Sequence, residues 1–240
     1  MTLELEVVQD PARACAAMMV SAAIGGGEMV LAGGSTPGAA YEHFVDTVTA
    51  VGLDLGSTRF WLGDERCVEP EDERSNYRMI KASLLDPLAP LTELDVHRIR
   101  GELGPEAAAE AYERELGDAG PPEFDLVLLG IGPDGHTASL FPGQSSLSVS
   151  SELVVGVPEA ALEPFVPRVS LTLAALTASR HVVILASGES KAEAIAAAFG
   201  PDAEPNPRVP ASMLAPQAER ITVLLDGAAA SRLPLSGRRP

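Results

Sequence analysis

The sequence predicts an α/β protein with a doubly wound, largely parallel sheet flanked by helices. Short apolar runs typical of buried strands alternate along the chain with segments whose apolar residues recur at helical spacing. That alternation is typical of βαβ units, which lay successive strands parallel to one another. The 240 residues can bury a sizeable core, and we expect a single domain over residues 1–240.

Six runs are short, apolar and bounded by turn residues, as strands buried in a parallel sheet are. They are Leu3–Val8, Met29–Ala32, Arg59–Leu62, Phe124–Leu129, His181–Ala186 and Ile221–Leu225. A further extended stretch lies at Leu94–Ile99. The Pro- and Gly-rich joints at Gly117–Pro122 and Gly200–Pro210 are short, so we interpret them as loops rather than domain linkers.

Helices are predicted in the intervals between the strands. Thr36 is expected to cap the second helix with Pro37 at its first helical position, and Ser75 or Asn76 to cap the third. Each segment carries apolar residues at roughly helical spacing. The predicted helices are Pro11–Ile24, Pro37–Val51, Asn76–Leu85, Pro105–Leu116 and Ser190–Phe199.

Composition and charge argue against several classes of protein. The formal net charge of −17 is unsuited to a nucleic-acid surface, which needs clustered lysine and arginine. No apolar run approaches the roughly 18 residues of a membrane span, and the start of the chain lacks the regions of a signal peptide. Cys15 and Cys67 show neither metal-ligand spacing nor a disulfide pattern. We therefore expect a cytoplasmic protein that uses neither a membrane nor nucleic acid as partner.

The strand at Phe124–Leu129 runs into a loop, GIGPDGHTASLFPG, that holds one carboxylate and one imidazole. In open α/β sheets, ligands bind in the crevice beyond the carboxyl ends of the strands. Asp134 and His136 follow such an end. We therefore predict that this loop carries the chemistry of the protein.

A second glycine loop, GGSTPG, follows the strand at Met29–Ala32 and opens a helix. Backbone N–H groups in such a loop, together with the helix dipole, can cradle a phosphate. An ordinary capped helix start explains the same residues equally well. The loop matches neither the dinucleotide fingerprint nor the Walker A pattern, so we expect no nucleotide.

Four further charged residues are candidates for the site. Asp64 follows the strand at Arg59–Leu62, and Arg78 lies on the helix that Ser75 or Asn76 opens, where it could clamp an anion. Arg168 in PRVSLT and Lys191 in GESKAEA are single cations, for which solvent exposure is the commoner explanation. An acidic protein that binds an anion must nevertheless bring its few cations together locally.

These motifs occur together and in order, and from about Leu31 to Ala230 the chain resembles the 6-phosphogluconolactonases. The resemblance rests on GGSTPG, GDERCVEPEDERSNYRM, GIGPDGHTASLFPG, PRVSLT, GESKAEA and PASML. It implies a sheet related to that of the glucosamine-6-phosphate deaminases. It also implies hydrolysis of a small-molecule substrate, 6-phosphoglucono-1,5-lactone, to 6-phosphogluconate in the pentose phosphate pathway, with no metal or organic cofactor.

The resemblance assigns roles to individual residues. His136 becomes the general base, with Asp134 and Asp64 lining the reacting end of the pocket. A neutral imidazole is available near pH 7 to take a proton from the attacking water. The residues implied in holding the substrate and its 6-phosphate are Gly34, Ser35, Thr36, Arg78, Arg168 and Lys191.

Two other classes remain open at this stage. The related isomerases and deaminases resemble GHIAFNEP after the glycine and carry a glutamate five residues beyond the histidine, where this chain has Phe141. A sugar-phosphate sensor domain would bind without chemistry, but it normally accompanies a basic DNA-binding module that is not apparent here. Neither a GxSxG elbow nor an SxxK pair supports a covalent route. His43, His97 and His181 are expected to be structural or solvent-facing.

Overall fold

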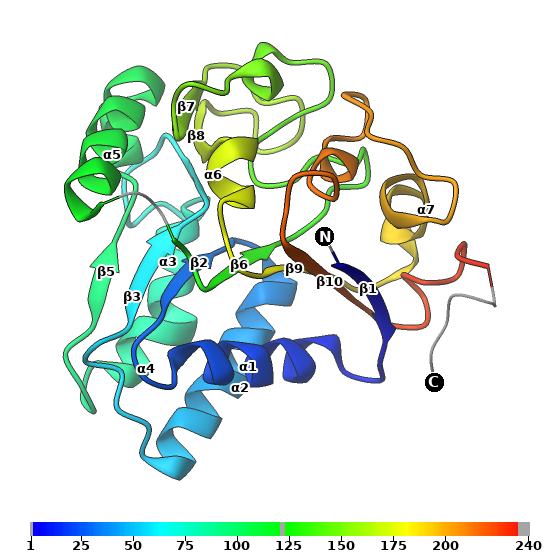
Figure 1. Cartoon of the computed structure of the whole chain (residues 1–240). Helices are drawn as coiled ribbons and strands as arrows, with labels where there is room; N and C mark the ends of the chain where they lie inside the picture. The colour runs from blue at the N-terminus through cyan, green and yellow to red at the C-terminus, as the bar shows by residue number, and fades with distance from the viewer. Residues whose placement is uncertain (1, 121–122, 235–240) are drawn as a thin grey trace.

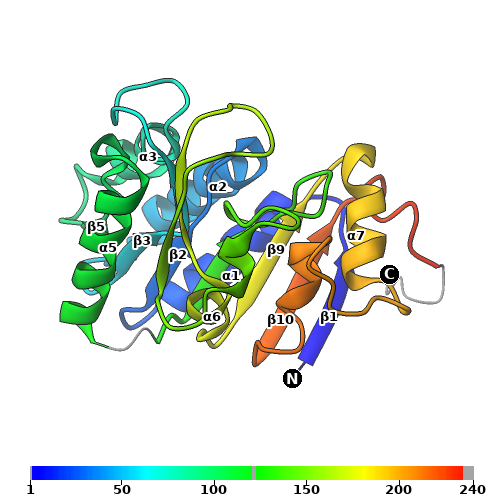
Figure 2. The ribbon, with the colours of Figure 1, turned by 90° about the horizontal axis from the view of Figure 1, so that it is seen from above.

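A central parallel sheet organises the fold of this protein, for which the computed structural model describes residues 2–120 and 123–234 (Figure 1). Its strands are β1 (Thr2–Val7), β2 (Glu28–Leu31), β3 (Arg59–Leu62), β5 (Asp95–His97), β6 (Leu126–Leu129), β9 (Val182–Ala186) and β10 (Arg220–Leu225). They hydrogen-bond in the order β1-β10-β9-β6-β2-β3-β5, and every pairing is parallel. Figure 2 shows β1 and β5 at the two opposite edges. The predicted parallel sheet is confirmed.

The order of the strands reverses beside β2. From β2 the chain adds β3 and then β5 on one side, whereas β6, β9 and β10 follow on the other side. A crevice forms at such a reversal, because the connections that leave β2 and β6 run to opposite faces of the sheet. Every residue of β6 and β9 is buried, as their uninterrupted apolar sequences predict.

Helices cover both faces of the sheet (Figure 1). On one face α1 (Pro11–Ala23) packs against α2 (Ser35–Val51), and on the other lie α5 (Pro105–Ala119), α6 (Leu173–Thr177) and α7 (Ala192–Phe199). The succession of α3 (Asn76–Ile80), a π-helical turn (Lys81–Leu85) and α4 (Asp86–Leu88) packs against α2. Single 3-10 turns occur at Gly101–Leu103, Ser145–Ser148, Glu189–Lys191 and Pro210–Met213. Within residues 2–120 and 123–234, no helix is long and apolar enough to cross a membrane.

A second, antiparallel sheet lies on the same side as α5. It contains β4 (Asp64–Arg66), β8 (Arg168–Leu171) and β7 (Val154–Val157), paired in that order. Helix α5 packs against both β7 and β8. This sheet is not apparent from the sequence, because its strands are three or four residues long and come from distant segments of the chain.

All five predicted helices are present, with three local differences. The predicted cap at Thr36 is wrong: α2 begins at Ser35, and Gly34 takes the capping position with φ of +106° and no side-chain hydrogen bond. This positive φ, which glycine adopts without strain, turns the chain into the helix two residues earlier than expected. The predicted helix at Asn76–Leu85 changes to a π-helical turn at Lys81, and the helix predicted from Ser190 starts as a 3-10 turn.

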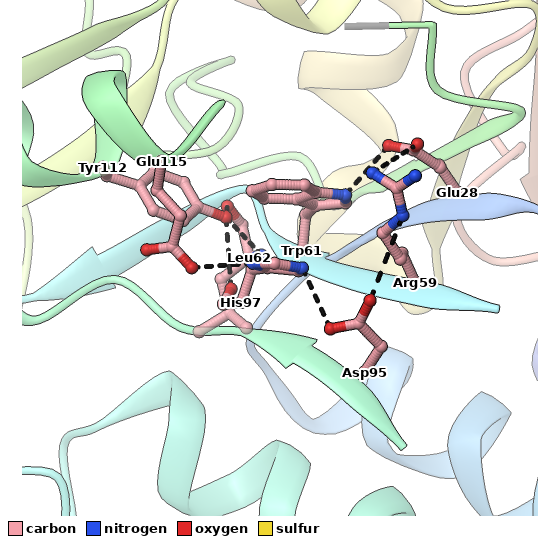
Figure 3. Close-up of polar contacts among 8 residues, drawn as sticks. All are labelled: Glu28, Arg59, Trp61, Leu62, Asp95, His97, Tyr112 and Glu115. Carbon is pink, nitrogen blue, oxygen red and sulfur yellow. Dashed lines mark hydrogen bonds and ion pairs between the residues drawn. The ribbon is translucent and has the colours of Figure 1, made fainter. Parts of the chain in front are cut away.

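A polar network fastens β5 to the edge of the sheet (Figure 3). The ring of His97 stacks on Trp61 with a centroid separation of 3.8 Å. Its Nδ1 lies 2.6 Å from Glu115 Oε1, and its Nε2 lies 3.1 Å from Asp95 Oδ1. On the far side of the indole, Trp61 Nε1 donates to Glu28 at 3.1 Å. His97 is therefore a structural residue, as predicted.

Replacing Tyr112 by phenylalanine is expected to lower the free energy of unfolding by about 1–3 kcal/mol. The Tyr112 hydroxyl accepts the Leu62 N–H at 2.9 Å and donates to the Leu62 carbonyl at 3.1 Å, so its removal leaves a buried N–H unpaired. Urea unfolding followed by circular dichroism measures the change. Tyr77→Phe is the control, because the Tyr77 hydroxyl makes no hydrogen bond in the described part of the chain. A Tyr112→Phe protein as stable as the parent would contradict this role.

Candidate active site

A cleft of about 480 Å³ lies at the carboxyl edge of the main sheet. The segments that follow β2, β3, β6 and β9 form its walls together with β8 of the small sheet. No group of three or more His, Cys, Asp or Glu residues suited to a metal ion occurs among residues 2–120 and 123–234. Of the nine residues predicted for the site, seven line this cleft: Gly34, Ser35, Thr36, Asp64, His136, Arg168 and Lys191. Asp134 was expected to line the pocket but does not, because its carboxylate is turned to the ring of His136.

His136 is held by Asp134, two residues before it. Its Nδ1 lies 2.6 Å from Asp134 Oδ1, and its backbone N–H donates to the same oxygen at 3.1 Å. Gly132 leaves the necessary space, because a Cβ there would lie 2.0 Å from His136 Nδ1. With Nδ1 engaged by a carboxylate, Nε2 is the ring nitrogen that remains for chemistry in the cleft.

The pKa of Asp134 reflects this contact. Burial alone would raise the pKa of its carboxyl, but the hydrogen bonds from the ring and amide of His136 and the charge of His136 outweigh that effect. The net result is a pKa below the ordinary aspartate value. Asp134 is therefore ionised at neutral pH, which suits a group that orients an imidazole and stabilises its protonated form.

Asp64 is a buried carboxylate that joins three segments of the chain. Ser139 Oγ donates to its Oδ2 at 2.6 Å, and Asn76 Nδ2 lies 3.2 Å from its Oδ1 and 2.9 Å from its backbone carbonyl. Ser139 belongs to the loop of His136, and Asn76 is the first residue of α3. Both oxygens of Asp64 are thus satisfied by groups that also position the walls of the cleft.

Asn76 depends on the small size of Gly33. A Cβ at Gly33 would lie 1.9 Å from Asn76 Oδ1, so a larger residue would displace the amide. Asn76 is 2% exposed and lines the cleft, and its Oδ1 accepts no hydrogen bond from the described residues. The sequence alone indicates Asn76 only as a candidate helix cap.

Glu65 fixes the backbone that carries Asn76. Its carboxylate accepts the N–H groups of Asn76 and Tyr77, each at 2.7 Å, and the hydroxyl of Ser75 at 3.0 Å. Burial raises the pKa of Glu65, and these hydrogen bonds oppose the rise. Glu65 therefore anchors the start of α3 to β4 and has a structural role beside the cleft.

The start of α2 and Lys191 form a region suited to an anion. Gly34, Ser35 and Thr36 line the cleft at the first turn of α2, where backbone N–H groups and the helix dipole favour negative charge. Lys191 reaches the same cleft from the segment after β9. Burial lowers the pKa of Lys191, and the charge of Asp134 partly offsets that effect.

Arg168 supplies a second cation from β8. It is 4% exposed, and its Nη2 donates to the carbonyls of Pro164 at 2.9 Å and Leu162 at 3.3 Å, while Nε donates to Val166 at 3.3 Å. Burial lowers the pKa of its guanidinium, and the nearby charge of Arg66 lowers it further. An arginine nevertheless stays protonated at neutral pH.

Arg66 adds a third cation that the sequence analysis left without a role. In the antiparallel pairing of β4 with β8, Arg66 stands directly opposite Arg168. Like charges in register destabilise a sheet, so this pairing favours a site that an anion can occupy. Arg66 lines the cleft, its Nη1 donates to the Arg74 carbonyl at 2.6 Å, and its Nε is buried without a partner in the described chain.

The structure does not bring Arg78 into the cleft. Ser75 caps α3 as predicted, because its Oγ accepts the Arg78 N–H at 3.1 Å. Asn76 and Arg78 are two residues apart on that helix, which places them on different faces. Asn76 faces the cleft, whereas the side chain of Arg78 is exposed and does not line it.

The comparison with known proteins identifies the family. A family model described as glucosamine-6-phosphate isomerases/6-phosphogluconolactonase matches residues 4–223. The chain belongs to this family. A 6-phosphogluconolactonase of Streptomyces coelicolor is 38% identical over 88% of this chain and 84% of its own. The human 6-phosphogluconolactonase is 40% identical over 73% of this chain and 69% of its own.

Solved structures of the family superpose on the whole fold. The 6-phosphogluconolactonase of Leishmania guyanensis covers 95% of this chain and 98% of its own, with a TM-score of 0.81 and 26% identity. A monomeric glucosamine-6-phosphate deaminase covers 97% of this chain and 100% of its own, with a TM-score of 0.81 and 22% identity. The second match confirms the predicted relation between this sheet and that of the deaminases.

Gly33→Ala is expected to lower the free energy of unfolding by about 1–3 kcal/mol, the usual effect of overpacking. The added Cβ would push the Asn76 amide away from Asp64, because it would lie 1.9 Å from Asn76 Oδ1. Urea unfolding measures the change. Gly117→Ala is the matched control: its Cβ meets nothing within 4 Å inside α5, so it should be neutral or stabilising. Equal stability of both variants would contradict the proposed fit of Gly33 against Asn76.

Proposed function

We propose that this protein is a 6-phosphogluconolactonase, which hydrolyses 6-phosphoglucono-1,5-lactone to 6-phosphogluconate in the pentose phosphate pathway. The observation that carries the proposal is a single cleft lined by His136, Lys191, Arg168 and the start of α2, with the ring of His136 held by Asp134. A lactone carbonyl needs a base that activates water, and a phosphate needs clustered donors and cations. The relatives named 6-phosphogluconolactonase, which align over most of the chain, support the same function.

In the proposed mechanism His136 acts as the general base. Its Nε2 takes a proton from a water molecule while the water oxygen attacks the lactone carbonyl carbon. The resulting tetrahedral oxyanion collapses, and the bond between that carbon and the ring oxygen breaks. The imidazolium then returns its proton to the departing ring oxygen, so one water is added and no cofactor is needed. Asp134 holds the ring through Nδ1 and stabilises the imidazolium.

The 6-phosphate is proposed to bind Gly34, Ser35 and Thr36 at the start of α2, together with Arg168 and Lys191. These groups create a local positive region in a protein whose formal net charge is −17. Binding energy from the phosphate then fixes the lactone carbon against the base.

Asp64 is proposed to line the reacting end of the cleft, where its link to Ser139 supports the His136 loop. Arg78 has no part in this arrangement, since its side chain does not line the cleft.

Hydrolysis is favoured over sugar isomerisation because Phe141, an apolar ring, contacts His136 with a centroid separation of 4.8 Å. A second carboxylate at that place would supply the additional acid or base that an isomerase needs.

We also propose a cytoplasmic location, which suits two cysteines that are both free.

The His136→Ala variant is expected to lose about 10²- to 10⁴-fold in kcat for 6-phosphoglucono-1,5-lactone, the usual contribution of a general base. Hydrolysis of freshly generated lactone at neutral pH, corrected for the spontaneous rate, measures the loss. His43→Ala serves as control, since His43 lies within α2 and does not line the cleft. Parent-like turnover by His136→Ala would discard this mechanism, and an inactive parent would discard the function.

Affinity for 6-phosphogluconate is expected to fall as pH rises through the pKa of Lys191, which lies below the ordinary lysine value of 10.5. The protonated ammonium of Lys191 attracts phosphate, and burial lowers its pKa, so the charge is lost at a lower pH than in a free lysine. Titration calorimetry across the alkaline range measures the fall. Lys191→Arg keeps its charge and should remove the pH dependence, whereas Lys81→Arg, an exposed control, should leave it. A parent affinity that stays constant up to pH 10.5 would contradict this role.

A further inference from the structure

Phe141 lies behind the cleft and contacts two of its functional groups. The side chain is 1% exposed, and its ring centroid lies 4.8 Å from that of His136 at an interplanar angle of 42°. The guanidinium carbon of Arg168 lies 5.8 Å from the same ring centroid. Phe141 does not itself line the cleft. One buried aromatic ring therefore touches both the proposed base and one of the proposed phosphate-binding cations.

Arg168 is fixed in place before any anion binds. Three carbonyls of the segment before β8, those of Leu162, Pro164 and Val166, accept hydrogen bonds from its Nη2 and Nε. The guanidinium is planar and presents its donors in a fixed fork. The carbonyls hold Nη2 and Nε, and the guanidinium carbon lies over the Phe141 ring. Nη1 has no acceptor in the described part of the chain and remains for a ligand.

His136 is fixed in a comparable way. Its Nδ1 is engaged by Asp134 at 2.6 Å, which sets the rotation of the ring. The ring of Phe141 packs against the imidazole at van der Waals range. The imidazole and the guanidinium thus both pack against the side chain of Phe141, which belongs to the same loop as His136.

We propose that Phe141 is a positioning residue that sets the separation between the His136 imidazole and the Arg168 guanidinium, and that it thereby selects lactones carrying a phosphate remote from the carbonyl. This inference rests on the proposed function. A phenyl ring is suited to the task, because it has only two side-chain torsions and keeps a fixed width between the groups that it touches. An aliphatic side chain of similar volume fills the space without fixing that distance.

The consequence for catalysis differs between substrates. Phosphate binding accelerates the reaction only if both ends of the substrate are held at the correct spacing, and a misplacement of about 1 Å can reduce the rate about 10²-fold. Loss of the cation–π contact alone corresponds to about threefold to thirtyfold. A lactone without phosphate does not use Arg168, so removal of the ring should affect it only through His136.

The test compares kcat/KM for 6-phosphoglucono-1,5-lactone and for unphosphorylated glucono-1,5-lactone in the parent and in Phe141→Leu. We expect kcat/KM for the phosphorylated lactone, divided by kcat/KM for the unphosphorylated lactone, to fall at least about tenfold in Phe141→Leu. The same ratio should stay near the parent value in Phe141→Tyr, which keeps the ring. Phe124→Leu is the matched control: it removes another buried ring, at the amino end of β6 and outside the cleft, and should leave the ratio unchanged. An unchanged ratio in Phe141→Leu would overturn the proposal.

A double-mutant cycle separates positioning from general loss of packing. In an Arg168→Met background, the Phe141→Leu change should reduce kcat/KM for the phosphorylated lactone by no more than it reduces kcat/KM for the unphosphorylated lactone in the parent background, because only the effect through His136 remains. Effects of the two changes that simply multiply would overturn the proposal. If circular dichroism shows that Phe141→Leu does not fold, Phe141→Met provides the same comparison with a flexible side chain. A parent that hydrolyses neither lactone would refute the proposed function, a distinct outcome from an active parent whose ratio is insensitive to Phe141.

Discussion

The parallel pairing of every strand in the main sheet is the constraint on which the position of the cleft depends. Parallel strands point in one direction, so the loops after β2, β3, β6 and β9 all leave at the same edge. The reversal of strand order beside β2 then separates two of these loops and opens the crevice between them. The antiparallel sheet of β4, β8 and β7 closes one side and contributes Arg66 and Arg168.

Buried hydrogen bonds hold these separate loops in one arrangement. Asp64 binds Ser139, which lies 75 residues away in the loop of His136. It also binds Asn76, which lies 12 residues away at the start of α3. Burial of a carboxylate is unfavourable unless its oxygens are paired, so each of these bonds is needed to keep Asp64 in place. Gly33 and Gly132 are part of the same arrangement, because a Cβ at either position would collide with Asn76 or His136.

The sequence predicts the main sheet and most of the cleft because both depend on local patterns. Fully apolar strands such as β6 and β9 are recognisable in a short window, and so is a glycine loop that follows directly after a strand. What the sequence cannot supply is pairing between distant segments. The register of β4 with β8, which sets Arg66 against Arg168, depends on two strands about 100 residues apart. The sequence correctly indicates that the helix carrying Arg78 begins near the cleft. It does not show which face of that helix Arg78 occupies, because a shift of one residue turns a side chain by about 100° around the helix axis.

In the proposed arrangement, one cleft holds the phosphate at the start of α2 and the reacting carbon at His136. A crystal structure of the protein with bound 6-phosphogluconate would show both ends of the ligand. We expect phosphate oxygens at hydrogen-bonding distance from the Gly34–Thr36 amides, Arg168 and Lys191, with the carboxylate of the product beside His136 Nε2. A phosphate seated against His136, or a ligand bound outside the cleft, would contradict this arrangement.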